Sequence, residues 1–374
     1  MKRVVQWLLL TVVIAAAAVK TYSLWTTTID AREMMPAVIA AGQAQAPNQY
    51  RVLVPLLWRG ATSLGVGADA ADRGIVAVSI VFCYAALAAA LYRSSGSLPV
   101  TALCLIAFYG AAASGFWFRY RDTFFDAGFT CLGMQLVLER RPAWGRYAGL
   151  SAVAALNRET WLFSLIAATI SRRADAKGTE DSGWARRDVI GLAGACLVAA
   201  AVLIAVRAQY GARPYHYDLW QYSNNVRLLL VAGGFRAVAG QAVWFAGSGL
   251  FVVWLMFALA GRASHVPFVA AFAGSLLATG FLVSNWAETR IFIPAYAVML
   301  VSCAGSSALT GLDADGPRGA VTVLARRAAV APGRASSATD WMRRATSSSG
   351  WGRRWQRRSR PVPAASPSVP SVRR

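Results

Sequence analysis

The chain has 374 residues, of which 56% are hydrophobic and only 15% are charged, and its formal net charge is +21. A composition this apolar excludes a soluble protein of this length. The long apolar runs also lack the alternation of apolar and polar residues that is typical of a membrane β-barrel. Without a glycine-rich phosphate loop or cysteine pairs at metal-ligand spacing, the sequence predicts neither a nucleotide-binding domain nor a structural zinc site. It predicts an α-helical, multi-pass membrane protein.

Apolar stretches of about 17 to 25 residues recur along the chain, which is the length that crosses the hydrocarbon core as a helix. We place them near residues 4–25, 74–92, 99–117, 125–139, 147–171, 188–207, 241–260, 266–284 and 291–310. The predicted fold class is therefore all-α, a polytopic bundle of about 8 to 10 membrane segments.

Lysine and arginine set the predicted orientation, because cytoplasmic loops are enriched in both. Lys2 and Arg3 place the N-terminus in the cytoplasm. The segment 147–171 breaks the alternation of sides, since the basic sequence 171–187 that follows it should also be cytoplasmic. A re-entrant hairpin of two short helices, broken at residues 157–159, resolves the conflict, and one full crossing is the alternative.

The sequence after residue 310 alternates arginine pairs with Trp, Ser, Pro and Gly. It has too little clustered apolar surface to fold, and we expect a disordered, basic cytoplasmic tail over 311–374 after a transmembrane catalytic domain over 1–310. The tail is expected to rest on anionic membrane lipids, with no role in nucleic-acid binding. The predicted location is the inner (plasma) membrane, with both termini in the cytoplasm.

Charged residues on the opposite, extracytoplasmic side are few and come from five separate parts of the chain. They combine carboxylates with arginines, and they can meet only if they line a common outward-facing cavity; solvated loop charges and local ion pairs are the alternative interpretation. An ionisable group at membrane depth costs about 2.5 to 3.5 kcal/mol, so such groups usually serve a function. We expect Arg158 and Glu159 to form a pair there. The candidate site residues are Asp30, Glu33, Arg51, Arg119, Asp122, Asn157, Arg158, Glu159, His216, Glu288 and Arg290.

Three sequence motifs follow one another along the chain in an order that can be compared with known families. "YRVLVP" (50–55) follows the first stretch and an acidic loop, "LERRPAWGRYAGLSAVAALNRETW" (138–161) lies in the middle, and "ETRIFIPAYAV" (288–298) precedes the last stretch. This order resembles the GT-C superfamily of membrane glycosyltransferases, over most of residues 1–310. The resemblance implies transfer of a hexose or pentose, with inversion, from a polyprenyl-phosphate sugar to a glycan or lipid acceptor at the outer face.

The resemblance also implies roles for the candidate residues. Asp30 is expected to be the catalytic base, with Glu33 in reserve. Arg51, Arg158 and Arg290 are expected to bind the phosphate, because a guanidinium group suits bidentate phosphate binding.

The remaining carboxylates complete the expected site. Asp122, Glu159 and Glu288 would orient the arginines or hold acceptor hydroxyls, since a buried charge without a partner is costly. A lipid-linked sugar donor is the co-substrate implied, and the need for a divalent metal stays open. The alternatives are a secondary transporter, which would use broken helices near the bilayer midplane, a lipid-linked polysaccharide polymerase or ligase, and a membrane scaffold.

Overall fold

The computed structural model describes residues 2–28, 35–46, 48–113, 121–139, 142–177, 186–213, 223, 226, 250–261, 263–283 and 292–305. All regular elements in these residues are helices, which confirms the all-α class for this part of the chain. They belong to one compact unit, Met1–Asp313. The predicted tail, 311–374, lies outside the described residues, so the division into a membrane domain and a tail stays a prediction.

The helices follow one another along the chain as α1 (Lys2–Thr26), α2 (Pro36–Ala40), the 3-10 helix η2 (Asn48–Tyr50), α3 (Leu53–Ser63), α4 (Ala68–Ser95), α5 (Leu98–Ala113), α6 (Thr123–Leu138), α7 (Trp144–Asn157), α8 (Trp161–Lys177), α9 (Arg186–Tyr210), α12 (Leu250–Leu259), α13 (Val266–Val283) and α14 (Ile293–Ala304). Within the described residues, α1, α4 and α9 are long and apolar enough to cross a membrane. Helices α5, α6, α13 and α14 are apolar but shorter. Several apolar helices thus indicate a membrane protein, while the predicted number of crossings is not confirmed.

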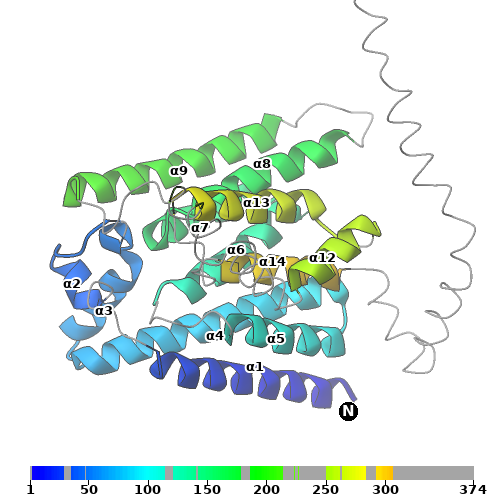
Figure 1. Cartoon of the computed structure of the whole chain (residues 1–374), viewed down its shortest axis with the longest axis horizontal. Helices are drawn as coiled ribbons and strands as arrows, with labels where there is room; N and C mark the ends of the chain where they lie inside the picture. Colours follow the sequence, from blue (N-terminus) through cyan, green and yellow to red (C-terminus); the bar gives the residue numbers. More distant parts are fainter. Residues whose placement is uncertain are drawn as a thin grey trace, which may run out of the picture. The chain divides into compact units, whose positions relative to one another are not determined.

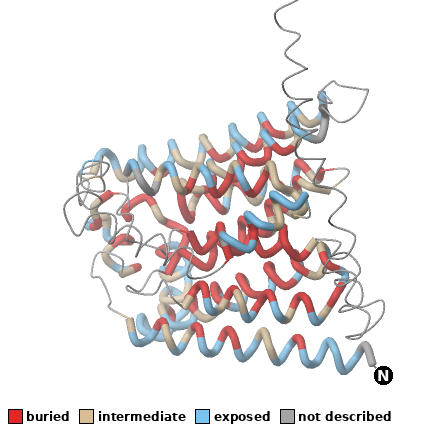
Figure 2. The backbone as a smooth tube through the Cα atoms, turned by 45° about the vertical axis from the view of Figure 1, so that its right-hand side comes forward, coloured by how far each residue is buried: buried red, intermediate tan, exposed pale blue. Residues whose placement is uncertain are grey.

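The long helices lie side by side in a bundle, with α1 and α9 on opposite flanks (Figure 1). Every residue of α14 is buried, as expected for a helix that is apolar on all sides. Buried residues concentrate in the middle of the bundle (Figure 2). The flanking helices expose large apolar side chains such as Leu9 of α1 and Leu197 of α9, which suits contact with lipid.

Helices α7 and α8 form an antiparallel hairpin, as the interrupted apolar run predicted. The start of α7, the end of α8 and the start of α9 meet at Asp188, whose carboxylate accepts hydrogen bonds from Trp144 Nε1 (3.0 Å) and Arg172 Nη2 (2.7 Å). With 14 and 17 residues, the two helices measure roughly 21 and 26 Å. The break between them is confirmed and a single continuous crossing is wrong. The side of the membrane that the break faces stays a prediction.

The two ends of the bundle differ, and we name them here. The tip end holds the break at 158–160, the starts of α4 and α6, and the end of α9. The basic end lies opposite and holds the ends of α4, α6 and α8. Segment 35–52 packs on the tip end, because Tyr50 Oη donates to the Gly211 carbonyl (3.1 Å) and accepts from the Arg213 backbone N–H (3.3 Å).

Candidate functional site

Four charged residues form a connected group at the tip end, which we call the tip cluster: Arg51, Asp122, Asp126 and Arg158. Arg158 Nε lies 2.8 Å from Asp122 Oδ2, and its Nη1 lies 3.4 Å from Asp126 Oδ2. Arg51 Nη1 approaches the same Asp122 oxygen at 3.2 Å. Arg158 is only 3% exposed and Asp126 only 4%. Residues far apart in the sequence therefore build one buried ion network.

The backbone at the hairpin break directs Arg158 into the cluster. Residue 158 is extended, with φ −158° and ψ 145°, so α7 ends there. Asn157 Nδ2 donates to the Asp122 carbonyl (3.0 Å), which ties the break to the start of α6. Thr160 Oγ1 donates to Asp126 Oδ2 (3.0 Å) from the other side of the break. Asn157, Arg158 and Thr160 thus position the charges of the tip cluster rather than continue a helix.

The spacing of the two aspartates explains why an arginine is needed between them. Asp122 precedes α6 and Asp126 lies in its first turn, where residues four apart share one face of the helix. Two carboxylates this close repel each other, and Arg158 compensates both. Removing one partner of a buried ion pair typically costs about 3 to 5 kcal/mol, because the remaining charge stays without compensation.

The predicted pair of Arg158 with Glu159 is wrong. Glu159 Oε1 lies 3.3 Å from Arg207 Nη2 near the end of α9, and both side chains are partly exposed. Because successive residues of an extended segment point to opposite sides, Arg158 faces the interior and Glu159 the surface. Arg207 also covers the ring of Tyr50, with its guanidinium carbon 4.8 Å from the ring centroid.

A second buried pair lies beside the tip cluster. Arg121 binds Asp72 of α4 with two contacts, Nε to Oδ1 at 2.5 Å and Nη2 to Oδ2 at 2.7 Å. The Arg121 guanidinium also lies over the Trp25 ring at the end of α1, 5.7 Å from its centroid. This pair connects α1, α4 and α6 at the same end as the tip cluster.

Several of these residues are absent from the candidate site. Asp72, Thr160 and Arg207 were not selected. Arg121 and Asp126 belong to the same group of outer charges as Arg119 and Asp122, but no role in the site was predicted for them. The sequence did contain a signal for Arg207. It is the single cation in the last turn of an apolar helix, and the predicted topology places the end of that helix on the same side of the membrane as Glu159. Asp72 lies among other charges in a stretch that reads as an ordinary loop, so its pairing had no sequence signal.

The selected residues divide into three groups. Arg51, Asp122, Asn157 and Arg158 lie together, and Glu159 lies at their edge, paired with Arg207. The remaining selected residues lie outside the described part of the chain, and their roles stay predictions: Asp30, Glu33, Arg119, His216, Glu288 and Arg290. Within the described residues, no three His, Cys, Asp or Glu side chains are grouped so as to hold a metal ion.

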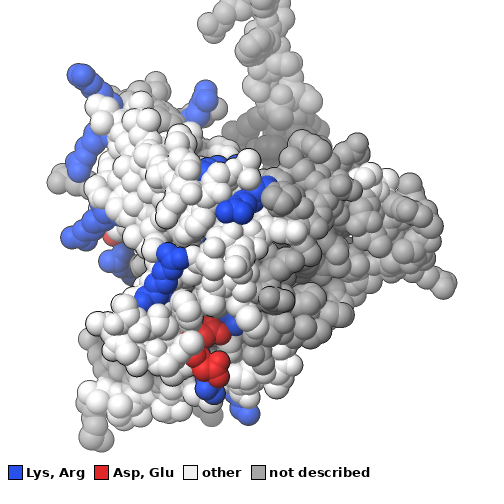
Figure 3. Space-filling view, turned by 90° about the vertical axis from the view of Figure 1, so that its left-hand side faces the viewer, with Lys and Arg blue, Asp and Glu red and all other residues white. Residues whose placement is uncertain are grey.

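Among the residues that the structure describes, the tip end carries more arginines than carboxylates. Arg59 Nη2 donates to the Ala40 carbonyl, and Arg213 Nε donates to the Tyr210 carbonyl at 3.1 Å, so neither has a carboxylate partner among the described residues. Figure 3 shows acidic side chains gathered together on this face, with basic side chains around them. The described charges of the tip end therefore have a positive balance.

Comparison with protein-family models, with curated proteins and with solved structures gives no match for this chain. In its described residues the chain is all-helical, with three helices long and apolar enough to cross a membrane and a buried arginine–carboxylate network at one end of the bundle.

Proposed function

We propose that the chain is an integral membrane glycosyltransferase, which moves a sugar from a polyprenyl-phosphate donor to a glycan or lipid acceptor outside the cytoplasm. The observation that carries the proposal is the state of Arg51. Its side chain is 16% exposed at the edge of the tip cluster, and its Nη1 lies 3.2 Å from Asp122 Oδ2. Its buried Nε has no hydrogen-bond partner among the described residues.

Arg51 is therefore the arginine of the tip cluster that a ligand can reach, whereas Arg158 is 3% exposed and is engaged by two carboxylates. A guanidinium group has five N–H donors in a planar fork that fits phosphate oxygens. Asp122 holds Arg51 at one corner, which limits the rotamers that the side chain has to give up on binding. In this arrangement Arg51 binds the donor phosphate, and Asp122 and Arg158 position it.

The base of the proposed reaction remains Asp30, with Glu33 in reserve. Asp122 Oδ2 already faces two guanidinium groups, and Asp126 is held by Arg158 and Thr160. These two carboxylates are placed to orient cations rather than to take a proton from an acceptor hydroxyl. The acidic loop after α1 offers a carboxylate on the same side in the predicted topology.

The transporter alternative has less support, because its broken helices would place ionisable groups near the middle of the bilayer. The break at 158–160 instead lies beside the start of α6 and the end of α9. A polysaccharide polymerase or ligase would use the same outer arginines, and it differs in transferring a lipid-linked glycan rather than a single sugar.

The test is turnover by the purified full-length chain with a panel of polyprenyl-phosphate hexoses and pentoses and a mixed lipid-extract acceptor. We expect one donor to be consumed, and Asp30→Asn to lower turnover by the ~10² to 10⁴-fold that a positioned base contributes. Glu33→Gln removes a carboxylate in the same way, and we expect it to lower turnover less.

The outcomes separate the hypotheses. Loss of turnover in Glu33→Gln with normal turnover in Asp30→Asn would move the base to Glu33. Consumption only of donors that carry several sugars would favour the polymerase or ligase. No consumption of any donor by monodisperse wild-type protein would sink the proposal.

A further inference from the structure

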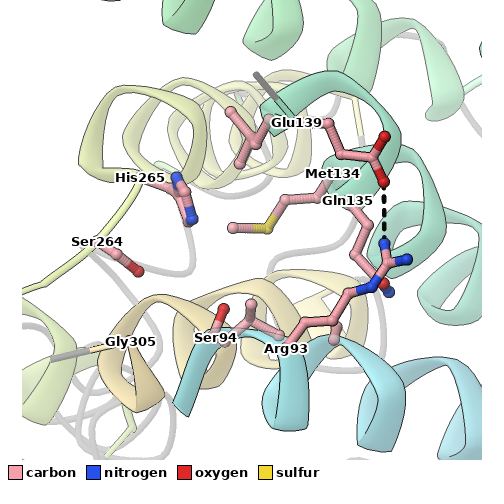
Figure 4. A pocket seen from close by; sticks show the side chains of 11 residues that line it. Arg93, Ser94, Met134, Gln135, Glu139, Ser264, His265 and Gly305 are labelled. Carbon is pink, nitrogen blue, oxygen red and sulfur yellow. Dashed lines mark hydrogen bonds and ion pairs between the residues drawn. The ribbon is translucent and has the colours of Figure 1, made fainter. Parts of the chain in front are cut away.

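A separate cavity opens at the basic end, away from the tip cluster. It has a volume of about 360 Å³ and lies between the ends of α4, α6 and α14 and the segment before α13. This is the low end of the range for small-molecule sites, about 300 to 1,000 Å³. Its polar lining includes Arg93, Gln135, Glu139 and His265, and apolar side chains such as Met134 complete it (Figure 4).

One wall of this cavity is built rigidly. His265 adopts φ 55°, the only positive φ of a non-glycine residue in the described part of the chain. Ser264 is held against the end of α14, because its backbone N–H and its hydroxyl both donate to the Ser302 carbonyl, each at 3.0 Å. A Cβ atom on Gly305 would lie 2.5 Å from Ser264 Oγ, so the Ser264 side chain packs closely against the Gly305 backbone. Strained backbone that is held in place so firmly is typical of functional sites.

The described residues of the opposite wall carry one charge of each sign. Arg93 Nη1 lies 3.0 Å from Glu139 Oε1, and the two side chains are 61% and 41% exposed. Figure 4 shows this pair across the cavity from the His265 ring. An exposed ion pair contributes little to stability, so a ligand that offers a partner to each group can open it at small cost.

The electrostatics select among possible ligands. Three helices, α4, α6 and α14, end at the cavity, and helix C-termini carry partial negative charge. Together with Glu139 they disfavour a simple anion, while Arg93 disfavours a simple cation. A zwitterion that places its anion on Arg93 and its ammonium group on Glu139 satisfies both.

We propose that the cavity binds the headgroup of an aminophospholipid, a phosphate diester linked to a primary ammonium group, as in phosphatidylethanolamine. The cavity lies at the end of α4, a helix long enough to cross the membrane, where lipid headgroups are found. The phosphate binds Arg93, the ammonium group donates to Glu139, and the apolar lining takes the start of the lipid body. This site does not depend on the proposed sugar transfer.

The experiment is native mass spectrometry of the full-length chain with equimolar phosphatidylethanolamine, phosphatidylglycerol and phosphatidylcholine. We expect phosphatidylethanolamine to be retained about tenfold over phosphatidylglycerol, the scale of one charge-assisted hydrogen bond. Phosphatidylcholine should bind more weakly, because its quaternary ammonium group has no N–H to donate. Glu139→Gln should abolish the preference, because Glu139 accepts from the ammonium group. Arg93→Gln should instead lower the retention of all three lipids, because the phosphate is common to them.

Two further variants distinguish ligand binding from a purely structural ion pair. The double variant Arg93→Glu with Glu139→Arg keeps an ion pair but reverses the charges relative to the acyl chains, so it should also lose the preference. Arg73→Gln removes a comparable exposed pair, Arg73 with Asp69 (3.3 Å), at the tip end, and should leave lipid retention unchanged.

Competition with free phosphoethanolamine identifies the source of the headgroup. Displacement of the lipid by the free compound would show that the headgroup alone suffices, and resistance to it would show that the lipid body contributes; both support the proposed chemistry. Equal retention of the three lipids by wild-type protein would overturn the proposal. A preference that persists in the charge-reversed double variant would overturn it as well.

Discussion

At the tip end Arg158 and Asp126 are almost fully buried, whereas at the basic end Arg146, Arg173 and Arg187 are exposed. The buried charges lie in contact with opposite charges contributed by other helices. The exposed ones project from helix ends that are held by packing and by single ion pairs. Buried arginine thus joins segments at the tip end, where Arg73 and Arg207 are nevertheless exposed. At the basic end these three exposed arginines face solvent or headgroups, and the partly buried Arg172 joins helices there, through Asp188.

The difference follows from the cost of removing a charge from water. A buried arginine is tolerated only when carboxylates compensate it, so its position fixes the segments that supply them. An exposed arginine imposes no such requirement and can accumulate wherever orientation in the membrane favours it. The excess of exposed arginine agrees with a cytoplasmic basic end, which stays a prediction.

The largest effect is expected at Arg158. Arg158→Ala would leave Asp122 and Asp126 close together and without their shared cation, and we expect a loss of about 3 to 5 kcal/mol in the free energy of unfolding. Arg93→Ala, at the basic end, should cost no more than about 1 kcal/mol. Thermal melting and membrane accumulation of both variants measure this. Equal stability of the two variants would contradict the contrast between the ends.

The sequence predicted the hairpin but not the charge pairing, and the reason is physical. Polar residues 157–159 interrupt an apolar run, and a local signal of that kind identifies a break. The partners of Arg158 lie far along the chain, 32 residues away for Asp126. Sequence proximity instead suggested Glu159, which the extended backbone turns to the surface. Partner choice depends on which helices pack together, and periodicity does not specify that.

The second largest effect concerns Arg51 and ligand affinity. Arg51→Gln leaves the contact of Asp122 with Arg158 in place, so the protein should fold normally. It removes charged donors, and hydrogen bonds to charged groups are worth about 1.5 to 3 kcal/mol, or about 10- to 100-fold in the Kd for polyprenyl phosphate. Equilibrium binding to purified protein measures it, with Arg73→Gln as a control from the same end. An unchanged Kd would remove Arg51 from the donor site.

The third prediction tests whether packing holds the basic end. A Cβ atom on Gly191 of α9 would lie 2.2 Å from the Trp144 ring, while nothing lies within 4 Å of one on Gly194. Gly191→Ala should therefore destabilise the protein by about 1 to 3 kcal/mol, the usual cost of overpacking. Gly194→Ala, on the same helix, should be neutral or stabilising by up to about 1 kcal/mol. Melting temperatures that do not separate the two variants would mean that Trp144 moves freely.

The smallest effect is expected at Tyr50, which attaches segment 35–52 to the end of α9. Tyr50→Phe removes the hydroxyl that bonds Gly211 and Arg213 but keeps the ring under Arg207. We expect a loss of about 1 kcal/mol, the net value of such a hydrogen bond. Tyr50→Leu, which also removes the ring, should lose about 0.5 to 1 kcal/mol more, because an exposed cation–π contact has that value. Equal melting temperatures of the phenylalanine and leucine variants would show that the contact of Arg207 with the ring does not stabilise the tip end.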